Sequence, residues 1–223
     1  MEKKIDRRIS YYAVFDTETA NGLDDPIMYD FGFAIVDKRG KVYDTRSMII
    51  REVFYGMRDL MKSAYYANKI PQYEKDIANG QRKVVSLYEA KKIFNDVCKE
   101  YNVKACIAHN ARFDYRSTSK TQRYLTKSKY RFFLPYGVEL WDTMKMANDT
   151  ICKQVHYKEW CHDNGYLTKR GVVRKTAEIL YRYISGEHDF SESHTGLEDV
   201  MIEKEIFAHC MRQHKPMRKK CFA

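Results

Sequence analysis

The chain opens with three stretches, of which the first two are rich in apolar and aromatic residues and the third has a mixed alternation of apolar and polar ones. They run from Tyr11 to Ala20, from Tyr29 to Val36, and from Lys41 to Ile50. β-Branched and aromatic residues favour strands, and turn residues at 21–26 and 38–40 separate the three stretches. The pattern predicts three consecutive strands that form an antiparallel meander.

Helical periodicity follows. Between Ser86 and Tyr101 apolar residues recur every three or four positions, and Ser86 and Glu89 have capping-box spacing. A weaker pattern predicts a helix over Val53 to Asn68, which Ile70-Pro71 should interrupt. This part also holds tyrosines for which we expect half-buried packing, with base stacking as the alternative: Tyr55, Tyr65, Tyr66 and Tyr73.

The second half alternates short strands with helices. Lys104 to Ala108 and Val138 to Trp141 are predicted core strands, and a helix is expected from Phe113 to about Thr126. Asp142 is a plausible N-cap of the next helix. Further on, the sequence predicts a small hairpin at 166–173 and a helix at 176–185 ended by Gly186. It then predicts a last helix that holds Asp199 in its first turn or two and runs to about Gln213, and a frayed basic tail at 215–220.

The composition indicates one globular domain. The 223 residues include 4 Pro and 10 Gly, and no linker or low-complexity tract divides them. We expect a single domain over residues 1–223. The six cysteines form no C-x-x-C motif, and no stretch is apolar enough for a signal segment or a membrane span. The sequence therefore predicts reduced thiols, a cytoplasmic location and no membrane partner.

The charge balance is strongly basic. The formal net charge is +10, which suits a polyanionic partner such as nucleic acid, although solubility alone can explain it. In the middle of the chain, cations are densest in and after the predicted helix at 113–126, where tyrosines are interleaved. A surface that tracks phosphates and a solvated basic face both remain open for this set: Arg116, Lys120, Arg123, Lys127, Lys129 and Arg131.

Two acids, Asp16 and Glu18, end the first predicted strand. Side chains two positions apart on a strand point to the same face, so both carboxylates project together. Like charges in a partly buried place repel each other, and a divalent cation with oxygen ligands would neutralise them. A solvated strand end with two incidental acids is the alternative.

Two further acids have similar positions. Asp114 follows the strand that ends at Ala108, and Asp199 lies in the first turns of the last helix. If neighbouring strands end together, these acids can converge with Asp16 and Glu18, and two divalent ions would then neutralise them. Such ions supply an activated water and a clamp on a scissile phosphate. His194, on the loop before the helix, is predicted to take the proton of that water, because imidazole titrates near neutral pH.

Three motifs resemble those of the DEDDh exonucleases, a group that includes proofreading subunits of bacterial DNA polymerases and oligoribonuclease. They are Phe15-Asp16-Thr17-Glu18-Thr19, His109-Asn110-Ala111-Arg112-Phe113-Asp114 and His194-Thr195-Gly196-Leu197-Glu198-Asp199. Trp141-Asp142-Thr143 also resembles the strand-to-helix step that lies between the second and third motifs of the family. The resemblance spans about residues 11–210.

The resemblance implies an α/β fold of the RNase H-like type, in which helices flank a mixed five-stranded sheet. It implies a 3′–5′ exonuclease that hydrolyses phosphodiester bonds of DNA or RNA and releases nucleoside 5′-monophosphates. The expected partner is a nucleic acid with a free 3′ end, single-stranded at that end. Residues 51–84 and the hairpin at 166–173 depart from the usual family pattern.

The resemblance also implies roles for single residues. Asp16 would bridge two Mg²⁺ or Mn²⁺ ions, Glu18 and Asp199 would hold the first ion, and Asp114 would hold the second. His194 would be the general base. Thr17 and Asn110 would position the terminal nucleotide. Two other functions compete with this one: a non-catalytic nucleic-acid-binding module on the same fold, and an endonuclease on the same scaffold.

Overall fold

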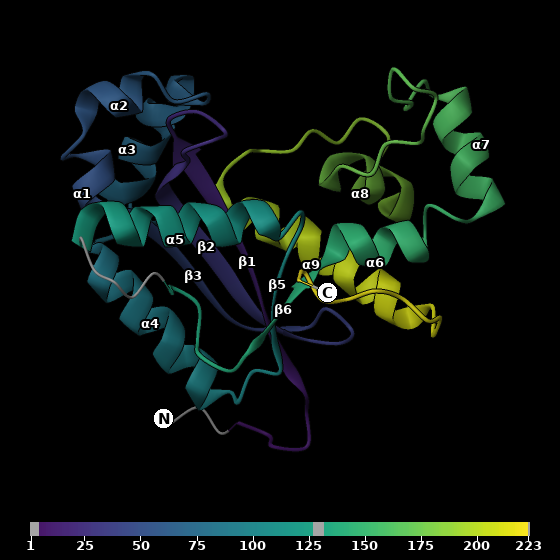
Figure 1. Cartoon of the computed structure of the whole chain (residues 1–223), viewed down its shortest axis with the longest axis horizontal. Helices are drawn as coiled ribbons and strands as arrows, with labels where there is room; N and C mark the ends of the chain where they lie inside the picture. Colours follow the sequence, from purple (N-terminus) through teal and green to yellow (C-terminus); the bar gives the residue numbers. More distant parts are fainter. Residues whose placement is uncertain (1–4, 127–131, 223) are drawn as a thin grey trace.

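A computed structural model describes residues 5–126 and 132–222, and these form a mixed sheet with helices on both faces (Figure 1). The sheet has six strands in the order β4-β3-β2-β1-β5-β6. The strands are β1 (Tyr11–Ala20), β2 (Ile27–Asp37), β3 (Val42–Ile50), β4 (Lys83–Val85), β5 (Ala105–Ala108) and β6 (Glu139–Asp142).

The predicted meander is confirmed, since β1, β2 and β3 pair antiparallel in chain order. Strands β5 and β6 extend the sheet in parallel on the far side of β1, as the short apolar stretches predicted. Strand β4 pairs in parallel with the other edge, next to β3. It adds a sixth strand to the expected five, and with three residues it is too short for its periodicity to be recognised.

The sheet separates two hydrophobic cores because side chains alternate between its faces. Along β1, Tyr11, Ala13 and Phe15 belong to the core on one face. Tyr12 and Val14 belong to the core on the other face. The strand that carries the first motif is thus packed on both sides, which fixes the direction of each of its side chains.

Most of the helices after β4 agree with the sequence pattern. Helix α4 (Leu87–Glu100) begins with the predicted capping box of Ser86 and Glu89. In Figure 1, α5 crosses in front of the sheet, while α6 to α8 lie to its right. The helices that follow α4 are α5 (Arg112–Thr126), α6 (Thr143–Asp149), α7 (Val155–Asp163), α8 (Ala177–Ser185) and α9 (Gly196–Arg212). Gly186 ends α8 in the left-handed conformation, and Asp142 caps α6, as expected.

The helix predicted over Val53 to Asn68 is wrong. The chain forms instead the short elements α1 (Arg51–Phe54), α2 (Arg58–Lys62), η1 (Ala67–Lys69) and α3 (Ile70–Ala78). A Cβ atom on Gly56 would lie 2.3 Å from the Glu52 carbonyl oxygen, so the chain turns sharply where only glycine fits. Pro71 lies in the first turn of α3, where no intrahelical donor is needed, and therefore starts a helix rather than interrupting one.

The basic tail is not frayed, which corrects a second expectation. The Asp142 amide donates to the Lys219 carbonyl, and the Cys221 amide donates to the Leu140 carbonyl, each at 2.8 Å. The tail therefore pairs with the open edge of β6, whose backbone groups attract such a segment. The small hairpin is confirmed by an antiparallel bridge between Leu167 and Val173.

Part of the basic stretch that the sequence singled out, namely Lys127, Lys129 and Arg131, lies outside the described residues. None of the helices at 5–126 and 132–222 combines the length and the apolar run that crossing a bilayer needs.

Candidate active site

A backbone contact between β2 and α9 brings the two halves of the site together. A Cβ atom on Gly32 would lie 2.3 Å from the Leu197 amide nitrogen, and one on Gly196 would lie 2.9 Å from the Gly32 nitrogen. Only residues without a side chain allow this approach. The contact holds the first turn of α9 directly against the sheet, beside β1.

Three of the four predicted acids meet at this point. Asp16 and Glu18 extend from the same face of β1, and Asp199 reaches them from the first turn of α9. Each can offer a carboxylate oxygen so that the three oxygens lie within 4.8 Å of one another. Asp16 is half-buried, whereas Glu18 and Asp199 are 8% and 5% exposed. We call Asp16, Glu18 and Asp199 the acid triad.

The acid triad lacks an ion-pair partner among the residues that the structure describes. In residues 5–126 and 132–222, no cationic side chain forms an ion pair with its carboxylates. Burial and the Asp114 carboxylate raise the pKa of Asp16, while burial and Asp199 raise the pKa of Glu18. Burial, followed by the charge of Glu192, raises the pKa of Asp199 to about 8. Lys69 opposes the shift at Glu18, but as the smallest of its causes.

Asp114, the fourth predicted acid, begins the buried face of α5 and lies beside the triad rather than in it. The Thr17 hydroxyl donates to Asp114 Oδ1 at 2.8 Å and also lies 2.8 Å from the Ser117 hydroxyl. Thr17 therefore points to the α5 side of β1, opposite Asp16 and Glu18. Burial raises the pKa of Asp114 to about 7 despite the Thr17 hydrogen bond.

His194 lies on the loop before α9, where the sequence placed it, with a left-handed backbone (φ 51°). Its ring stacks on Tyr66 with the centroids 4.5 Å apart and the planes 14° apart. Its Nδ1 atom lies 3.9 Å from a Glu192 carboxylate oxygen. Burial, and then the charge of Lys69, lowers the pKa of His194, so the imidazole is neutral at neutral pH.

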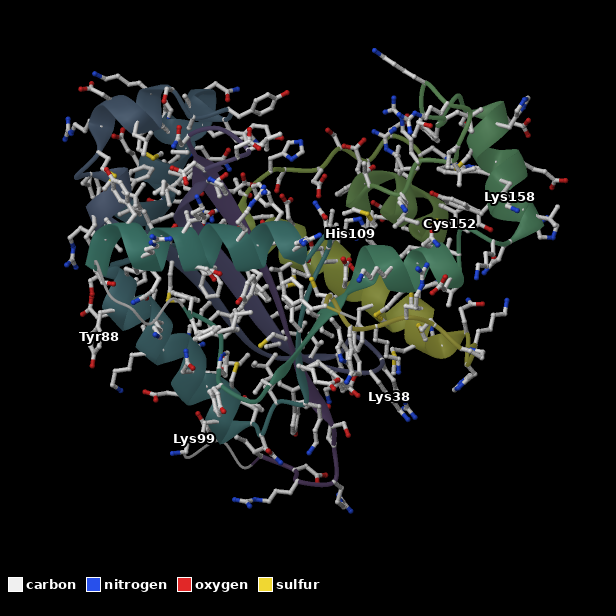
Figure 2. All side chains as sticks on the ribbon, viewed as in Figure 1. Lys38, Tyr88, Lys99, His109, Cys152 and Lys158 are labelled. Atoms are coloured by element: carbon white, nitrogen blue, oxygen red, sulfur yellow. The ribbon has the colours of Figure 1, made fainter. Side chains whose placement is uncertain are left out.

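The second motif forms the turn between β5 and α5. Asn110 is exposed and has a left-handed backbone with a φ of 60°. Its backbone N–H donates a hydrogen bond to Asp142 Oδ1 at 3.2 Å. His109 lies between α5 and α6 (Figure 2), and its ring nitrogens bond the Thr143 hydroxyl at 2.9 Å and the Lys175 carbonyl at 2.8 Å. Both ring nitrogens of His109 are thus engaged within the fold.

Sequence reasoning missed Glu203, a fifth acid that is 3% exposed. Glu203 lies one helical turn after Asp199, and its charge raises the pKa of Asp16. Its Oε2 atom has no hydrogen-bond partner among the described residues. The spacing of four residues from Asp199 on one helix was the available signal.

Sequence reasoning also missed the buried pair of Asp30 and Arg82. Asp30 is 0% exposed and Arg82 is 3% exposed, and their side chains lie 3.1 Å apart. Arg82 also bonds Glu198 of α9 at 2.8 Å, and the Gly196 amide donates to Asp30 at 2.9 Å. The available signal was the position of Asp30 as a single acid inside an apolar strand, because a buried carboxylate needs a cationic or hydrogen-bonding partner.

No protein-family model matches the sequence, and no curated protein matches it. A solved structure of a full-length 3′-exonuclease is similar at 12% identity and a TM-score of 0.56, over 98% of this chain and 66% of that one. Escherichia coli Exonuclease I, solved with an oligonucleotide, is similar at 12% identity and a TM-score of 0.50, over 89% of this chain and 40% of that one.

Exonuclease X, solved with 5′-overhanging duplex DNA, gives 18% identity and a TM-score of 0.48 over 91% of this chain and 92% of that one. At these identities the likeness concerns the fold alone. The likeness to the full-length 3′-exonuclease, at a TM-score of 0.56, confirms the mixed α/β architecture of the RNase H-like type that the motifs implied.

Proposed function

We propose that the protein is a metal-dependent 3′–5′ exonuclease of the DEDDh type, which hydrolyses phosphodiester bonds of DNA or RNA. The observation that carries this proposal is the acid triad, whose three oxygens lie within 4.8 Å without a cationic side chain to neutralise them. The fold shared with a 3′-exonuclease supports it. The products would be nucleoside 5′-monophosphates.

The residues fit divalent cations. Converging buried carboxylates repel one another unless they are protonated or bind a cation, and carboxylate oxygens are the ligands that Mg²⁺ and Mn²⁺ prefer. In the proposed arrangement Asp16, Glu18 and Asp199 would hold the ions together with Asp114. Bound ions would supply an activated water, a clamp on the scissile phosphate and stabilisation of the leaving oxygen.

His194 is the proposed general base. Because its pKa is lowered, the neutral imidazole is available at neutral pH to accept the proton of the attacking water. Tyr66 stacks on one face of the ring, which restricts the directions in which the ring can turn. Thr17 fixes the Asp114 carboxylate through its hydroxyl. The contact of Thr17 and Asn110 with the terminal nucleotide stays a prediction.

The decisive experiment follows mononucleotide release from a 3′-labelled single strand in Mg²⁺ or Mn²⁺, in EDTA, and with Asp16→Ala. We expect release only from the wild type with metal, with the circular form of the strand left intact. Binding without product in any metal would instead indicate the non-catalytic module. Cleavage of the circle would indicate the endonuclease.

A second experiment tests the base. We expect His194→Ala to lower the turnover rate by about 10²- to 10⁴-fold, because general-base catalysis is worth that much. The affinity for the strand, measured by anisotropy in EDTA, should stay close to that of the wild type. A loss confined to affinity would contradict the role of His194.

A further inference from the structure

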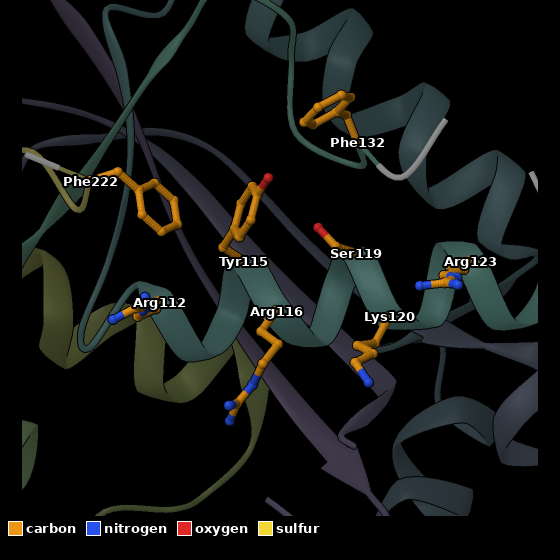
Figure 3. A pocket seen from close by; sticks show the side chains of 8 residues that line it. All are labelled: Arg112, Tyr115, Arg116, Ser119, Lys120, Arg123, Phe132 and Phe222. Atoms are coloured by element: carbon orange, nitrogen blue, oxygen red, sulfur yellow. The ribbon is translucent and has the colours of Figure 1, made fainter. Parts of the chain in front are cut away.

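The outer face of α5 lines a cavity of about 640 Å³, on the opposite side of the helix from Asp114. Figure 3 shows Tyr115 and Ser119 pointing from α5 toward Phe132 and Phe222, which stand beside it. We call this cavity the α5 pocket. It is lined by Arg112, Tyr115, Arg116, Ser119, Lys120, Arg123, Phe132 and Phe222.

Aromatic rings are unusually accessible in the α5 pocket. Phe132 and Phe222 are 60% and 53% exposed, and the ring of Phe222 meets that of Tyr115 edge to face at 4.9 Å. The Ser119 hydroxyl has no hydrogen-bond partner among the described residues. The Ser119 oxygen is buried beneath these rings, so the accessible part of the pocket is flat and apolar, which suits a planar ligand.

The rim of the α5 pocket is cationic. Lys120 pairs with Asp25 at 2.6 Å, and Arg116 donates to the Leu23 carbonyl at 2.5 Å, so these two cations also hold the loop between β1 and β2. Arg112 and Arg123 have no ion pair or hydrogen bond with the rest of the described chain. They lie eleven residues apart on one helix, or about 16 Å at 1.5 Å per residue.

That separation matches a strand of several nucleotides. Stacked bases repeat at about 3.4 Å, so about 16 Å spans roughly five of them. Exposed rings between two unpaired guanidinium groups offer stacking for bases and ion pairs for the phosphates that flank them. Bases inside a duplex are already stacked and paired, which favours an unpaired strand as the occupant.

We propose that the α5 pocket binds single-stranded nucleic acid upstream of the 3′ end that enters the acid triad. Bases stack on Phe222, Tyr115 and Phe132, and phosphates pair with Arg112 and Arg123. The proposal rests on the proposed function for its account of the 3′ end. The pocket itself makes no contact with the acid triad, so the two can be tested apart.

The first test measures binding in EDTA, where no hydrolysis is expected, with labelled single strands of three and of fifteen nucleotides. Phe222→Ala should weaken binding of the longer strand about tenfold and leave the shorter one unchanged, because base–aromatic stacking is worth roughly that much per base. Tyr88→Ala is the matched control, since Tyr88 is 73% exposed on α4, away from the pocket (Figure 2). An equal effect of both variants, or of Phe222→Ala on both lengths, would overturn the proposal.

The second test separates phosphate contacts from general charge. Arg123→Ala should reduce the slope of log affinity against log salt by about one for the longer strand. Lys38→Ala removes an equal charge elsewhere and should leave that slope unchanged. If the slopes agree, or if wild type is a dimer that Phe222→Ala converts to a monomer, the pocket is not a strand site.

Hydrolysis in Mg²⁺ then distinguishes the two proposals. With Phe222→Ala we expect normal release from the three-nucleotide strand and slower release from the longer strand at limiting concentration. Failure of every variant and of wild type to hydrolyse either strand would remove the proposed function and leave the binding result standing. Normal hydrolysis of both lengths by Phe222→Ala would remove the α5 pocket and leave the exonuclease.

Discussion

Two buried carboxylates on neighbouring strands have opposite surroundings. Glu18 of β1 and Asp30 of β2 face each other across the ladder and are 8% and 0% exposed. Asp30 Oδ2 accepts hydrogen bonds from the Arg82 guanidinium at 3.1 Å, the Tyr73 hydroxyl at 2.9 Å and the Gly196 backbone N–H at 2.9 Å. Glu18 has further carboxylates beside it.

The difference separates two uses of a buried acid. Burying a charge is costly unless a partner compensates it, so an acid that serves the fold has its partner within the chain. The acid triad has none in the described chain, and its fold tolerates that cost beside a site where a cation fits. Variants that remove either arrangement should therefore fail in different ways.

The largest effect is expected for Asp199→Asn. The amide keeps the shape of the side chain but loses the charge that holds a divalent cation, so turnover should fall by at least about 10³-fold. Above about pH 8, where Asp199 is ionised, the melting temperature of the metal-free protein should not fall, because one repelling charge is gone. Asp163→Asn, at an exposed site, is the control for activity. Turnover close to wild type would contradict the assignment of the triad.

Arg82→Met should instead damage the fold. It leaves Asp30 buried without its cation, which costs about 3–5 kcal/mol of unfolding free energy. Urea denaturation measures this loss. The double variant Arg82→Met with Asp30→Asn should regain a part of it, because the orphaned charge is removed. A loss below about 1 kcal/mol would show that Arg82 does not stabilise Asp30.

The acid triad should make the metal-free protein sensitive to pH. Burial raises the pKa of Asp199 to about 8 and that of Asp114 to about 7, whereas both would titrate near 3.8 in the unfolded chain. Between these values the folded state holds more protons than the unfolded state, so stability falls as pH rises from about 4 to about 8.

Melting temperatures in EDTA should therefore decrease by several degrees from pH 5 to pH 8.5. Mg²⁺ should reverse the decrease at the alkaline end, where the carboxylates are ionised and bind it. Parallel curves with and without Mg²⁺ would contradict metal binding by these groups.

The smallest effect is expected for an exposed pair. Lys92 and Asp96 lie 2.6 Å apart on α4 with side chains 62% and 60% exposed. Water and salt screen such a pair, so Lys92→Ala should change the unfolding free energy by less than about 0.5 kcal/mol. A larger loss in urea denaturation would mean that burial does not explain why the Arg82 ion pair contributes more to the unfolding free energy than an exposed pair does.

Local patterns were sufficient for much of the fold. The meander follows from β-branched and aromatic stretches separated by turns, and the capping box of α4 requires only Ser86 and Glu89. The positions of Asp16 and Glu18 on one face follow from strand alternation alone. These features depend on neighbours in the sequence, which is why the sequence predicts them.

Features that depend on distant partners were not predictable. Strand β4 exists because the edge of β3 accepts it, and the tail is ordered because β6 offers free backbone groups. Glu203 and Asp30 look like ordinary acids until α9 is placed on the sheet. Tyr66 reaches His194 only because the chain at 51–69 breaks into short helical pieces.

The contact at Gly32 has a consequence for anyone who mutates this protein at random. A single methyl group there would displace Leu197 and with it the helix that carries Asp199. In a library selected for activity, substitutions of Gly32, which takes no part in the chemistry, should therefore be lost as completely as substitutions of Asp199. Loss of activity in such a screen would then report on the distance between two backbones and not on a reacting group. The purified inactive variants would still contain every active-site residue, with Asp199 displaced from the other two acids.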